Sequence, residues 1–203
     1  PSRGLGDVYK RQSAYSVVKS ITCDCARPTV TVKCNENTGK PVLSWKAVDG
    51  ASKYYIYRST DGGKTYKYWD STSKTSYTNS GAEAGKTYYY KVKAVCGKSS
   101  YGNSAQSLAK SIVCDCAKPV LSITAVNGKP KLSWNAVDGA TKYWVYRSTD
   151  GKNFKYYDTT TKLSYTNMST TAGTTYYYKL KAVNGSTNYD ASALSNAVSL
   201  KVK

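Results

Sequence analysis

The stretch "KPVLSWKAVDGASKYYIYRSTDG" at residues 40–62 decides the fold of this chain, because it returns as "KPKLSWNAVDGATKYWVYRSTDG" at residues 129–151. Each copy ends in an Asp-Gly pair, which tolerates the positive φ angles of the tight turns that join antiparallel strands. Before that turn the side chains alternate, so Tyr54 and Ile56 are expected on one face of a strand and Tyr55 on the other. The stretch therefore predicts β-strands joined by hairpin turns, repeated once along the chain.

The repeat continues on both sides of this stretch. "CDCARP" at residues 23–28 returns as "CDCAKP" at residues 114–119, and "TYYYKVKAV" at residues 87–95 returns as "TYYYKLKAV" at residues 175–183. Each half of the 203-residue chain has about 100 residues, the usual size of a small all-β domain. Short strand patterns recur about seven times per copy, separated by turn formers. We predict an all-β protein built as two tandem seven-stranded Greek-key β-sandwiches.

The repeat also sets the expected domain bounds. The two sandwiches are predicted at residues 26–113 and, together with a linker, at residues 114–203. "SAYSVVKSITCDC" at residues 13–25 matches the end of the first copy, so these residues are expected to be the last strand of a truncated upstream repeat plus its linker. Residues 1–12 match nothing else in the chain and resemble translated adapter or vector sequence, so we expect them to be non-native.

Several residues resemble a known family at the positions where that family has its motifs. A proline opens the first strand, Trp45 lies in the second, and "YYYKVKA" at residues 88–94 lies in the sixth, as in fibronectin type III and other immunoglobulin-like domains. The likeness covers residues 26–203 and extends to the fibronectin type III repeats of extracellular proteins of gut Firmicutes. It implies a bacterial protein that is secreted or displayed on the cell surface. The resemblance implies, in addition, a core made by Trp45, Tyr54, Ile56, Tyr90, Val92, Trp134, Tyr143, Val145, Tyr178 and Leu180, with Tyr88 and Tyr176 bonded to backbone at the sheet corner.

The even number of cysteines in an extracellular setting predicts disulfides. A bond between Cys34 and Cys96 is excluded by topology, because a strand of nine residues separates the two poles by about 30 Å and a disulfide allows about 7 Å between Cα atoms. We expect Cys96 to pair with Cys23 or Cys25, and Cys34 to pair across the domain junction with one cysteine of the second "CDC". The six candidate disulfide cysteines are Cys23, Cys25, Cys34, Cys96, Cys114 and Cys116.

The residues that commonly carry catalysis or bind metals are scarce. The chain has no histidine, which removes the commonest general base, and the two "CDC" pairs stand a whole domain apart, which disfavours the alternative of a metal site. Four of the 12 carboxylates precede glycine in predicted turns, where aspartate is a structural choice: Asp49, Asp61, Asp138 and Asp150. No apolar run approaches the roughly 20 residues of a membrane span. We expect no enzyme activity, no cofactor, no metal and no membrane contact.

One predicted surface could bind a ligand. The sheet made by the third, fourth, sixth and seventh strands should carry aromatic and lysine side chains on its outer face, namely Tyr55, Tyr57, Tyr89, Lys91, Lys93, Trp144, Tyr146, Tyr177, Lys179 and Lys181. Such side chains can stack on sugar rings or hold an anionic polymer. They also stabilise an exposed sheet by about 0.2–1 kcal/mol per cross-strand pair without any ligand.

These patterns predict a non-catalytic structural or interaction module. Its expected role is to space or present the domains of a larger secreted or cell-surface bacterial protein, with adhesion as one form of that role. The alternative is carbohydrate binding, or binding of an anionic cell-surface polymer, through the aromatic and lysine face. The formal net charge is +18 and is spread over both copies, which favours a solvated surface over a dedicated anion site. We expect neighbouring domains of the parent protein as partners, a glycan or cell-wall polymer under the alternative, no nucleic acid, and a monomer.

Overall fold

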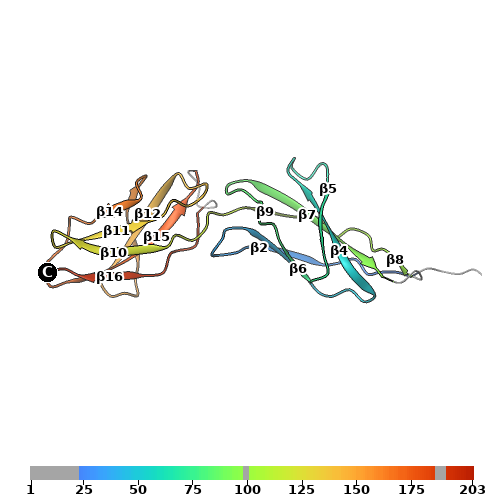
Figure 1. Cartoon of the computed structure of the whole chain (residues 1–203), viewed down its shortest axis with the longest axis horizontal. Coiled ribbons are helices and arrows are strands. Elements are labelled where there is room, and N and C mark those ends of the chain that lie inside the picture. Colours follow the sequence, from blue (N-terminus) through green and yellow to red (C-terminus); the bar gives the residue numbers. More distant parts are fainter. Residues whose placement is uncertain (1–22, 98–100, 186–190) are drawn as a thin grey trace, which may run out of the picture.

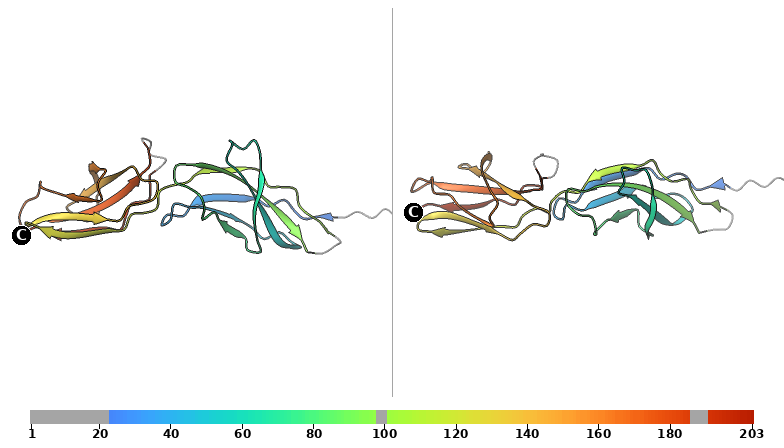
Figure 2. Two further views of the ribbon diagram at one scale, coloured as in Figure 1. Left: turned by 45° about the horizontal axis from the view of Figure 1, so that its top comes forward. Right: turned by 90° about the horizontal axis from the view of Figure 1, so that it is seen from above.

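The computed structural model describes residues 23–97, 101–185 and 191–203. These ranges form two β-sandwiches that lie end to end in an elongated molecule (Figure 1), and they contain no helix. The two domains stay end to end in both rotated views (Figure 2). The first described strand, β1 (Cys23–Asp24), and the C-terminal residue lie at opposite ends of the long axis. The predictions for residues 1–12 and 13–22 lie outside the described residues.

Domain 1 contains seven strands in two sheets. The three-stranded sheet has the order β2 (Val30–Cys34), β3 (Pro41–Trp45), β6 (Ser76–Thr78). The four-stranded sheet has the order β5 (Lys67–Thr72), β4 (Ala51–Ser59), β7 (Thr87–Cys96), β9 (Lys110–Val113), and all neighbours in both sheets are antiparallel. A short parallel pair joins β1 to β8 (Tyr101–Gly102) at the outer end of the domain.

Domain 2 repeats this arrangement strand for strand. Its three-stranded sheet has the order β10 (Leu121–Val126), β11 (Lys129–Trp134), β14 (Ser164–Thr166). Its four-stranded sheet has the order β13 (Lys155–Thr160), β12 (Lys142–Ser148), β15 (Thr175–Val183), β16 (Val198–Lys201). The predicted fold class, an all-β chain of two seven-stranded Greek-key sandwiches, is confirmed.

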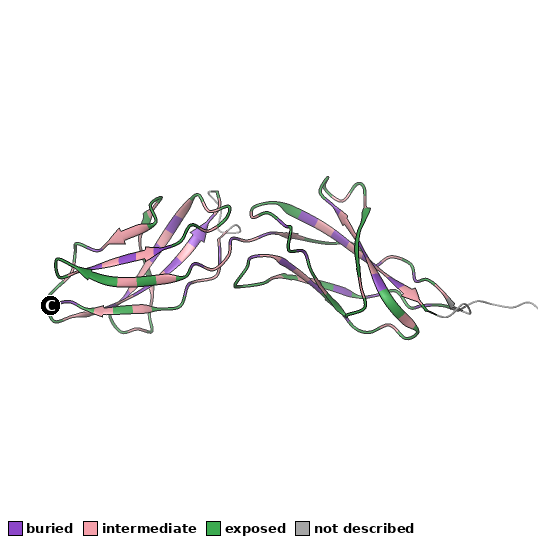
Figure 3. Ribbon diagram, in the orientation of Figure 1, coloured by how far each residue is buried: buried purple, intermediate pink, exposed green. Residues whose placement is uncertain are grey.

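The cores lie between the two sheets of each domain. Buried and half-buried residues alternate along β7 and β15, as a strand with one face toward a core requires (Figure 3). Trp45 packs edge-on against Tyr54 at 5.1 Å between ring centroids, and Trp134 packs against Tyr143 at 5.2 Å. The corner bonds also form, because the Oη atom of Tyr88 accepts a hydrogen bond from a backbone N–H at 2.9 Å. All the expected core residues are buried: Trp45, Tyr54, Ile56, Tyr88, Tyr90, Val92, Trp134, Tyr143, Val145, Tyr176, Tyr178 and Leu180.

The linker between the domains, residues 114–120, is held by the turn that follows β2. The Gly39 carbonyl accepts a hydrogen bond from the Asp115 amide at 3.2 Å, and the Asn37 carbonyl accepts one from the Lys118 amide at 3.3 Å. Gly39 has a φ of 68°, and a Cβ atom there would overlap the Asp115 carbonyl. Glycine is therefore needed at this position both for its backbone angle and for the close approach of the linker.

A second turn of domain 1 holds the linker from the other side. The Gly85 amide donates to the Cys114 carbonyl at 2.7 Å, and the Cys114 amide donates to the Lys86 carbonyl at 2.9 Å. Ala84, in the same turn, packs against the core cluster of domain 2. Backbone hydrogen bonds from two turns and an apolar contact make the junction a formed interface.

One disulfide joins Cys25 to Cys96, with the Cα atoms 6.6 Å apart. This is one of the two pairings expected for Cys96, and the excluded pairing of Cys34 with Cys96 does not form. Cys34 and Cys114 both carry thiols in this structure, so the expected bond across the junction stays a prediction. Cys116 is buried in the core of domain 2, and the side chain of Cys23 lies outside the described residues.

Candidate binding face

The outer surface of the four-stranded sheet brings the predicted aromatic and lysine residues of domain 1 together. Antiparallel pairing of β4 with β7 places Tyr55 opposite Lys93 and Tyr57 opposite Lys91. Tyr89 lies two pairs further along, opposite Ser59. All five predicted side chains are half-buried, because each packs against its neighbours on the sheet while one side stays open to solvent.

The neighbouring strand β5 adds a ring that the sequence analysis did not include. Tyr68 lies opposite Tyr57, and its ring packs edge-to-face with Tyr55 at 5.4 Å and with Tyr57 at 6.2 Å between centroids. Tyr68 is 56% exposed, which makes it the most accessible ring of the three. An irregularity in the β4–β5 pairing lies beside it, between Ile56 and Tyr57. The three tyrosines form one aromatic cluster at the centre of the face.

Lysine side chains lie over or beside these rings. The Lys91 ammonium lies 4.2 Å from the ring centroid of Tyr66, and the Lys53 ammonium lies 5.2 Å from that of Tyr55. Cations at these distances are attracted to the ring faces. Burial raises the pKa of the Tyr66 phenol, and nearby Tyr89 and Asp61 add to this effect. The face therefore combines positive charge, open rings and hydroxyl donors.

Domain 2 reproduces the same face with two changes of ring type. Trp144 stands opposite Lys181 and Tyr146 opposite Lys179, and both rings pack edge-to-face against Tyr156 at 6.4 Å and 6.1 Å. Tyr156 is 56% exposed, as its counterpart is in domain 1. The remaining parts of the face follow the first copy, with Tyr177 opposite Ser148, the Lys179 ammonium 4.5 Å from the Phe154 ring and the Lys142 ammonium 5.9 Å from the Trp144 ring.

The ten predicted face residues thus fall into two matching clusters, one on each domain. The structure adds Tyr66 and Tyr68 in domain 1, and Phe154 and Tyr156 in domain 2. A signal for them was present, because residues two apart on the return strand of each hairpin share a face.

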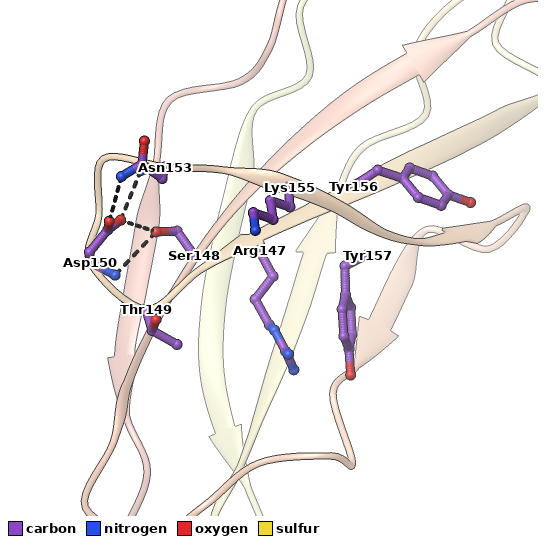
Figure 4. A pocket seen from close by; sticks show the side chains of 8 residues that line it. All are labelled: Arg147, Ser148, Thr149, Asp150, Asn153, Lys155, Tyr156 and Tyr157. Atoms are coloured by element: carbon purple, nitrogen blue, oxygen red, sulfur yellow. Dashed lines mark hydrogen bonds between the residues drawn. The ribbon is translucent and has the colours of Figure 1, made fainter.

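A surface pocket of about 630 Å³ lies beside the turn that joins β12 to β13 (Figure 4). Arg147 and Tyr157 point the same way from neighbouring strands, with the guanidinium carbon 3.8 Å from the ring centroid. The Arg147 guanidinium also donates to the Ser169 carbonyl at 3.2 Å. Lys155 adds a second positive charge to the pocket lining.

The one carboxylate that lines that pocket already accepts hydrogen bonds from other residues of the same turn. Asp150 accepts hydrogen bonds from the Ser148 hydroxyl at 2.6 Å and from the Asn153 amide at 2.8 Å (Figure 4). These bonds, the Ser148 hydroxyl first among them, hold the pKa of Asp150 well below its usual range. In domain 1, Asp61 lies in the corresponding turn, which is one residue longer, and its pKa is lowered first by the hydroxyl of Ser59. Carboxylates that are ionised at neutral pH and whose oxygens already accept several hydrogen bonds are poor general acids or bases.

Two further kinds of site are not found in the part of the chain that the structure describes. No group of three or more His, Cys, Asp or Glu side chains in residues 23–97, 101–185 and 191–203 is placed to hold a metal ion. Within the same ranges no helix has the length and apolar character that crossing a bilayer requires.

Comparison with known proteins identifies the fold. A two-domain fibronectin type III segment of chicken tenascin superposes with a TM-score of 0.54 over 88% of this chain and 100% of the tenascin segment, at 18% sequence identity. The chain therefore has the fibronectin type III fold twice, as the sequence resemblance implied. The chain matches no protein-family profile.

Two curated enzymes share a domain-sized stretch with this chain. An amylopullulanase of Thermoanaerobacter thermohydrosulfuricus is 41% identical over 85 residues, which is 40% of this chain and 6% of the enzyme. A poly(3-hydroxybutyrate) depolymerase of Ralstonia pickettii is 41% identical over 85 residues, which is 42% of this chain and 16% of the enzyme. The chain thus resembles only a small part of either protein.

Proposed function

We propose that this chain is a non-catalytic spacer that holds and presents other domains of a larger extracellular bacterial protein. The observation that carries this proposal is that two enzymes whose names denote unlike substrates each share a domain-sized stretch with this chain. A module of this kind, present in enzymes of unlike substrates, accounts for neither reaction, whereas a role in joining or presenting catalytic domains suits both.

Two features of the structure support the spacer role. The domains lie end to end (Figure 1), so that a neighbour attached at each end would be kept apart by the length of both sandwiches. Backbone hydrogen bonds on both sides of the linker favour a fixed angle between the domains over free rotation. The Cys25–Cys96 disulfide is consistent with an oxidising location outside the cytoplasm.

Small-angle X-ray scattering of the full chain tests the spacer. We expect one extended shape for the native protein, and a broader distribution of shapes for Gly39→Ala, because the new Cβ atom pushes the linker away from its turn. The matched control is Gly128→Ala. Gly128 occupies the same place in domain 2 and also has a positive φ, of 72°, but it has only the Lys203 carbonyl nearby, so the backbone strain is similar and the junction is untouched.

Scattering from the native chain that fits two freely jointed domains would contradict the spacer. Equal broadening by Gly39→Ala and Gly128→Ala would show that the junction hydrogen bonds do not set the angle.

The duplicated aromatic and lysine face favours a second function, namely binding of a polysaccharide or an anionic cell-surface polymer. The same cluster of three rings with two cross-strand lysines occurs on both domains, and each has one ring that is 56% exposed. Two equal weak sites on one rigid chain would gain affinity for a long polymer by acting together.

Sedimentation with insoluble polysaccharides and purified bacterial cell walls tests this binding. We expect the double variant Tyr68→Ala/Tyr156→Ala to lose binding, because it removes the most exposed ring of each face and disturbs the core least. The control is Thr31→Ala/Ser122→Ala, which alters exposed side chains on the opposite sheets. Retention of polymer binding by the tyrosine variant, or loss by the control, would dismiss the face as the site.

A further inference from the structure

Cys34 and Cys114 meet at the junction between the domains. Cys34 is the last residue of β2, and its thiol donates a hydrogen bond to the Val113 carbonyl at 3.2 Å. Because Val113 directly precedes Cys114, ordinary backbone dimensions place the Cys34 sulfur within about 7 Å of the Cys114 Cα atom. The Cys114 thiol in turn donates to the Gly39 carbonyl at 3.2 Å, in the turn that follows β2. Each thiol therefore lies against the segment that carries the other.

The surroundings hold these two segments together independently of the thiols. The Asp115 amide donates to the Gly39 carbonyl at 3.2 Å, one residue beyond Cys114. On the other side, the Cys114 amide donates to the Lys86 carbonyl at 2.9 Å. Cα atoms in disulfides are about 4.4–6.8 Å apart. A bond between the two sulfurs requires that both side chains rotate away from their carbonyl acceptors.

The repeat supplies a second observation. Domain 2 carries Ala125 at the position of Cys34 and folds into the same sandwich, so the sandwich itself does not require a cysteine there. Cys34 is only half-buried, and it belongs to the junction more than to the core of domain 1. A cysteine at this place is explained by a partner on the linker.

We propose that Cys34 and Cys114 form a disulfide in the oxidised protein, which ties the first hairpin of domain 1 to the interdomain linker. The first "CDC" cysteine of the linker, and not the second, is the partner. Cys116 belongs to the core cluster of domain 2, whereas Cys114 belongs to the core cluster of domain 1 and its thiol contacts the hairpin turn that follows Cys34. The inference rests on the junction geometry and holds whether or not either face binds a polymer.

The reaction needs an external oxidant, and a low-molecular-mass disulfide such as oxidised glutathione is of the right class. One protein thiol loses its proton and attacks a sulfur of the external disulfide, which forms a mixed disulfide and releases one thiolate. The second protein thiol loses its proton and attacks the protein sulfur of the mixed disulfide, which releases the other thiolate. The two released thiolates take up the two protons. Two protein thiols are oxidised, and one external disulfide is reduced to two thiols.

The burial of both thiols sets the rate of this step. Burial raises the pKa of Cys34 to about 11 and raises the pKa of Cys114 as well. The charged groups that face them are Asp115 at both thiols, and Lys40 and Asp138 at Cys114. Since only the thiolate attacks, we expect the rate of bond formation to rise about tenfold per pH unit across the mildly alkaline range.

Peptide mapping of the full chain tests the proposal. The chain is incubated with oxidised glutathione at several pH values, alkylated with iodoacetamide, digested without reduction and analysed by mass spectrometry. We expect a linked pair of peptides that contain Cys34 and Cys114, lighter by two hydrogens than the two thiol peptides together, and the loss of alkylation at both residues. The linked pair should persist in Cys116→Ala and disappear in Cys114→Ala, where Cys34 is recovered as the alkylated thiol or as its mixed disulfide with glutathione.

Alkylation of Cys34 at every pH after oxidation would overturn the proposal, and so would a linked pair of Cys34 with Cys116. The map of the native chain decides this by itself if Cys116→Ala does not fold. If the Cys34–Cys114 disulfide does not form, the expected scattering and sedimentation results are unchanged. A failed disulfide proposal can therefore be told apart from a failed proposal for the function.

Discussion

Domain 1 and domain 2 have the same strand order, the same buried aromatic residues and the same outer face, yet they differ in the bonds that tie their interiors. In domain 1 a disulfide joins Cys25 to Cys96, whereas Asn184 occupies the position of Cys96 in domain 2 and rules out that bond there. The sandwich therefore depends on the apolar pattern that both copies share, and the disulfide is an addition made in one of them.

A buried asparagine shows the opposite difference. In both domains its Nδ2 donates to a core tyrosine hydroxyl, from Asn79 to Tyr90 at 2.8 Å and from Asn167 to Tyr178 at 2.7 Å. In domain 2 the Asn167 Oδ1 also accepts from the Tyr157 hydroxyl at 3.1 Å. Domain 1 has Trp69 at that position, and the Asn79 Oδ1 has no hydrogen-bond partner among the described residues. Domain 1 is thus better cross-linked, and domain 2 is better hydrogen-bonded.

Removal of the disulfide is expected to give the largest difference in unfolding free energy between the two domains. The bond links residues that are 71 positions apart in the sequence. A disulfide that closes a loop of this size stabilises the folded state by about 4 kcal/mol, because it restricts the unfolded chain. We expect the double variant Cys25→Ala/Cys96→Ala to lower the unfolding free energy of domain 1 by this amount and to leave domain 2 unchanged. Hydrogen exchange followed by peptide mass spectrometry resolves the two domains. An equal loss of protection in both would show that they unfold as one unit.

Truncation of a core side chain gives the next largest expected effect, and the unfolding free energies of the two domains should fall by similar amounts. Leu43 and Leu132 occupy equivalent places and are both fully buried. Truncation of a buried leucine to alanine costs about 3 kcal/mol, from lost transfer free energy and from the cavity that remains. We expect Leu43→Ala and Leu132→Ala to destabilise their own domains by similar amounts in the same exchange experiment. A clear difference between the two would mean that the cores are packed differently despite their common pattern.

The buried asparagines give a smaller effect of opposite sign in the two domains. Tyr157→Phe removes the hydroxyl that donates to the Asn167 Oδ1 and should destabilise domain 2 by about 1 kcal/mol. Trp69→Tyr supplies domain 1 with the missing donor, and we expect a smaller gain, because the indole that lies 3.2 Å from the Arg58 guanidinium is lost. Destabilisation by Trp69→Tyr as large as that by Tyr157→Phe would show that the indole contact outweighs the hydrogen bond.

Much of this molecule could be predicted from its sequence, because strict alternation along β4 and β7 gives each side chain one face. The corner tyrosines were implied by the resemblance to fibronectin type III domains, and the pairing of Cys96 with a "CDC" cysteine followed from the expected strand topology. Alternation places Tyr66 and Tyr68 on one face, but it does not show where the pairing of β5 with β4 shifts, between Ile56 and Tyr57. The choice between Cys23 and Cys25 could not be made either, since residues two apart in an extended chain point to the same side.

The two aspartate turns, which differ by one residue in length, give the smallest expected effect, visible only at acid pH. The hydrogen bonds of Asp61 and Asp150, from the hydroxyls of Ser59 and Ser148 first, lower the pKa of each carboxyl in the folded protein. A lowered folded pKa means that the stabilisation is complete above the unfolded value of about 3.9 and is lost as the pH falls below it.

We therefore expect the melting temperature of the native chain to fall between about pH 5 and about pH 2, and to fall less in Asp61→Asn/Asp150→Asn, which has no charge to lose at these positions. Scanning calorimetry over that range measures both slopes. Because both turns contribute in the same sense, each single variant should remove part of the acid dependence, from its own domain. Parallel slopes for the native chain and the double variant would mean that other carboxylates carry the acid dependence and that the two turns stay intact when protonated.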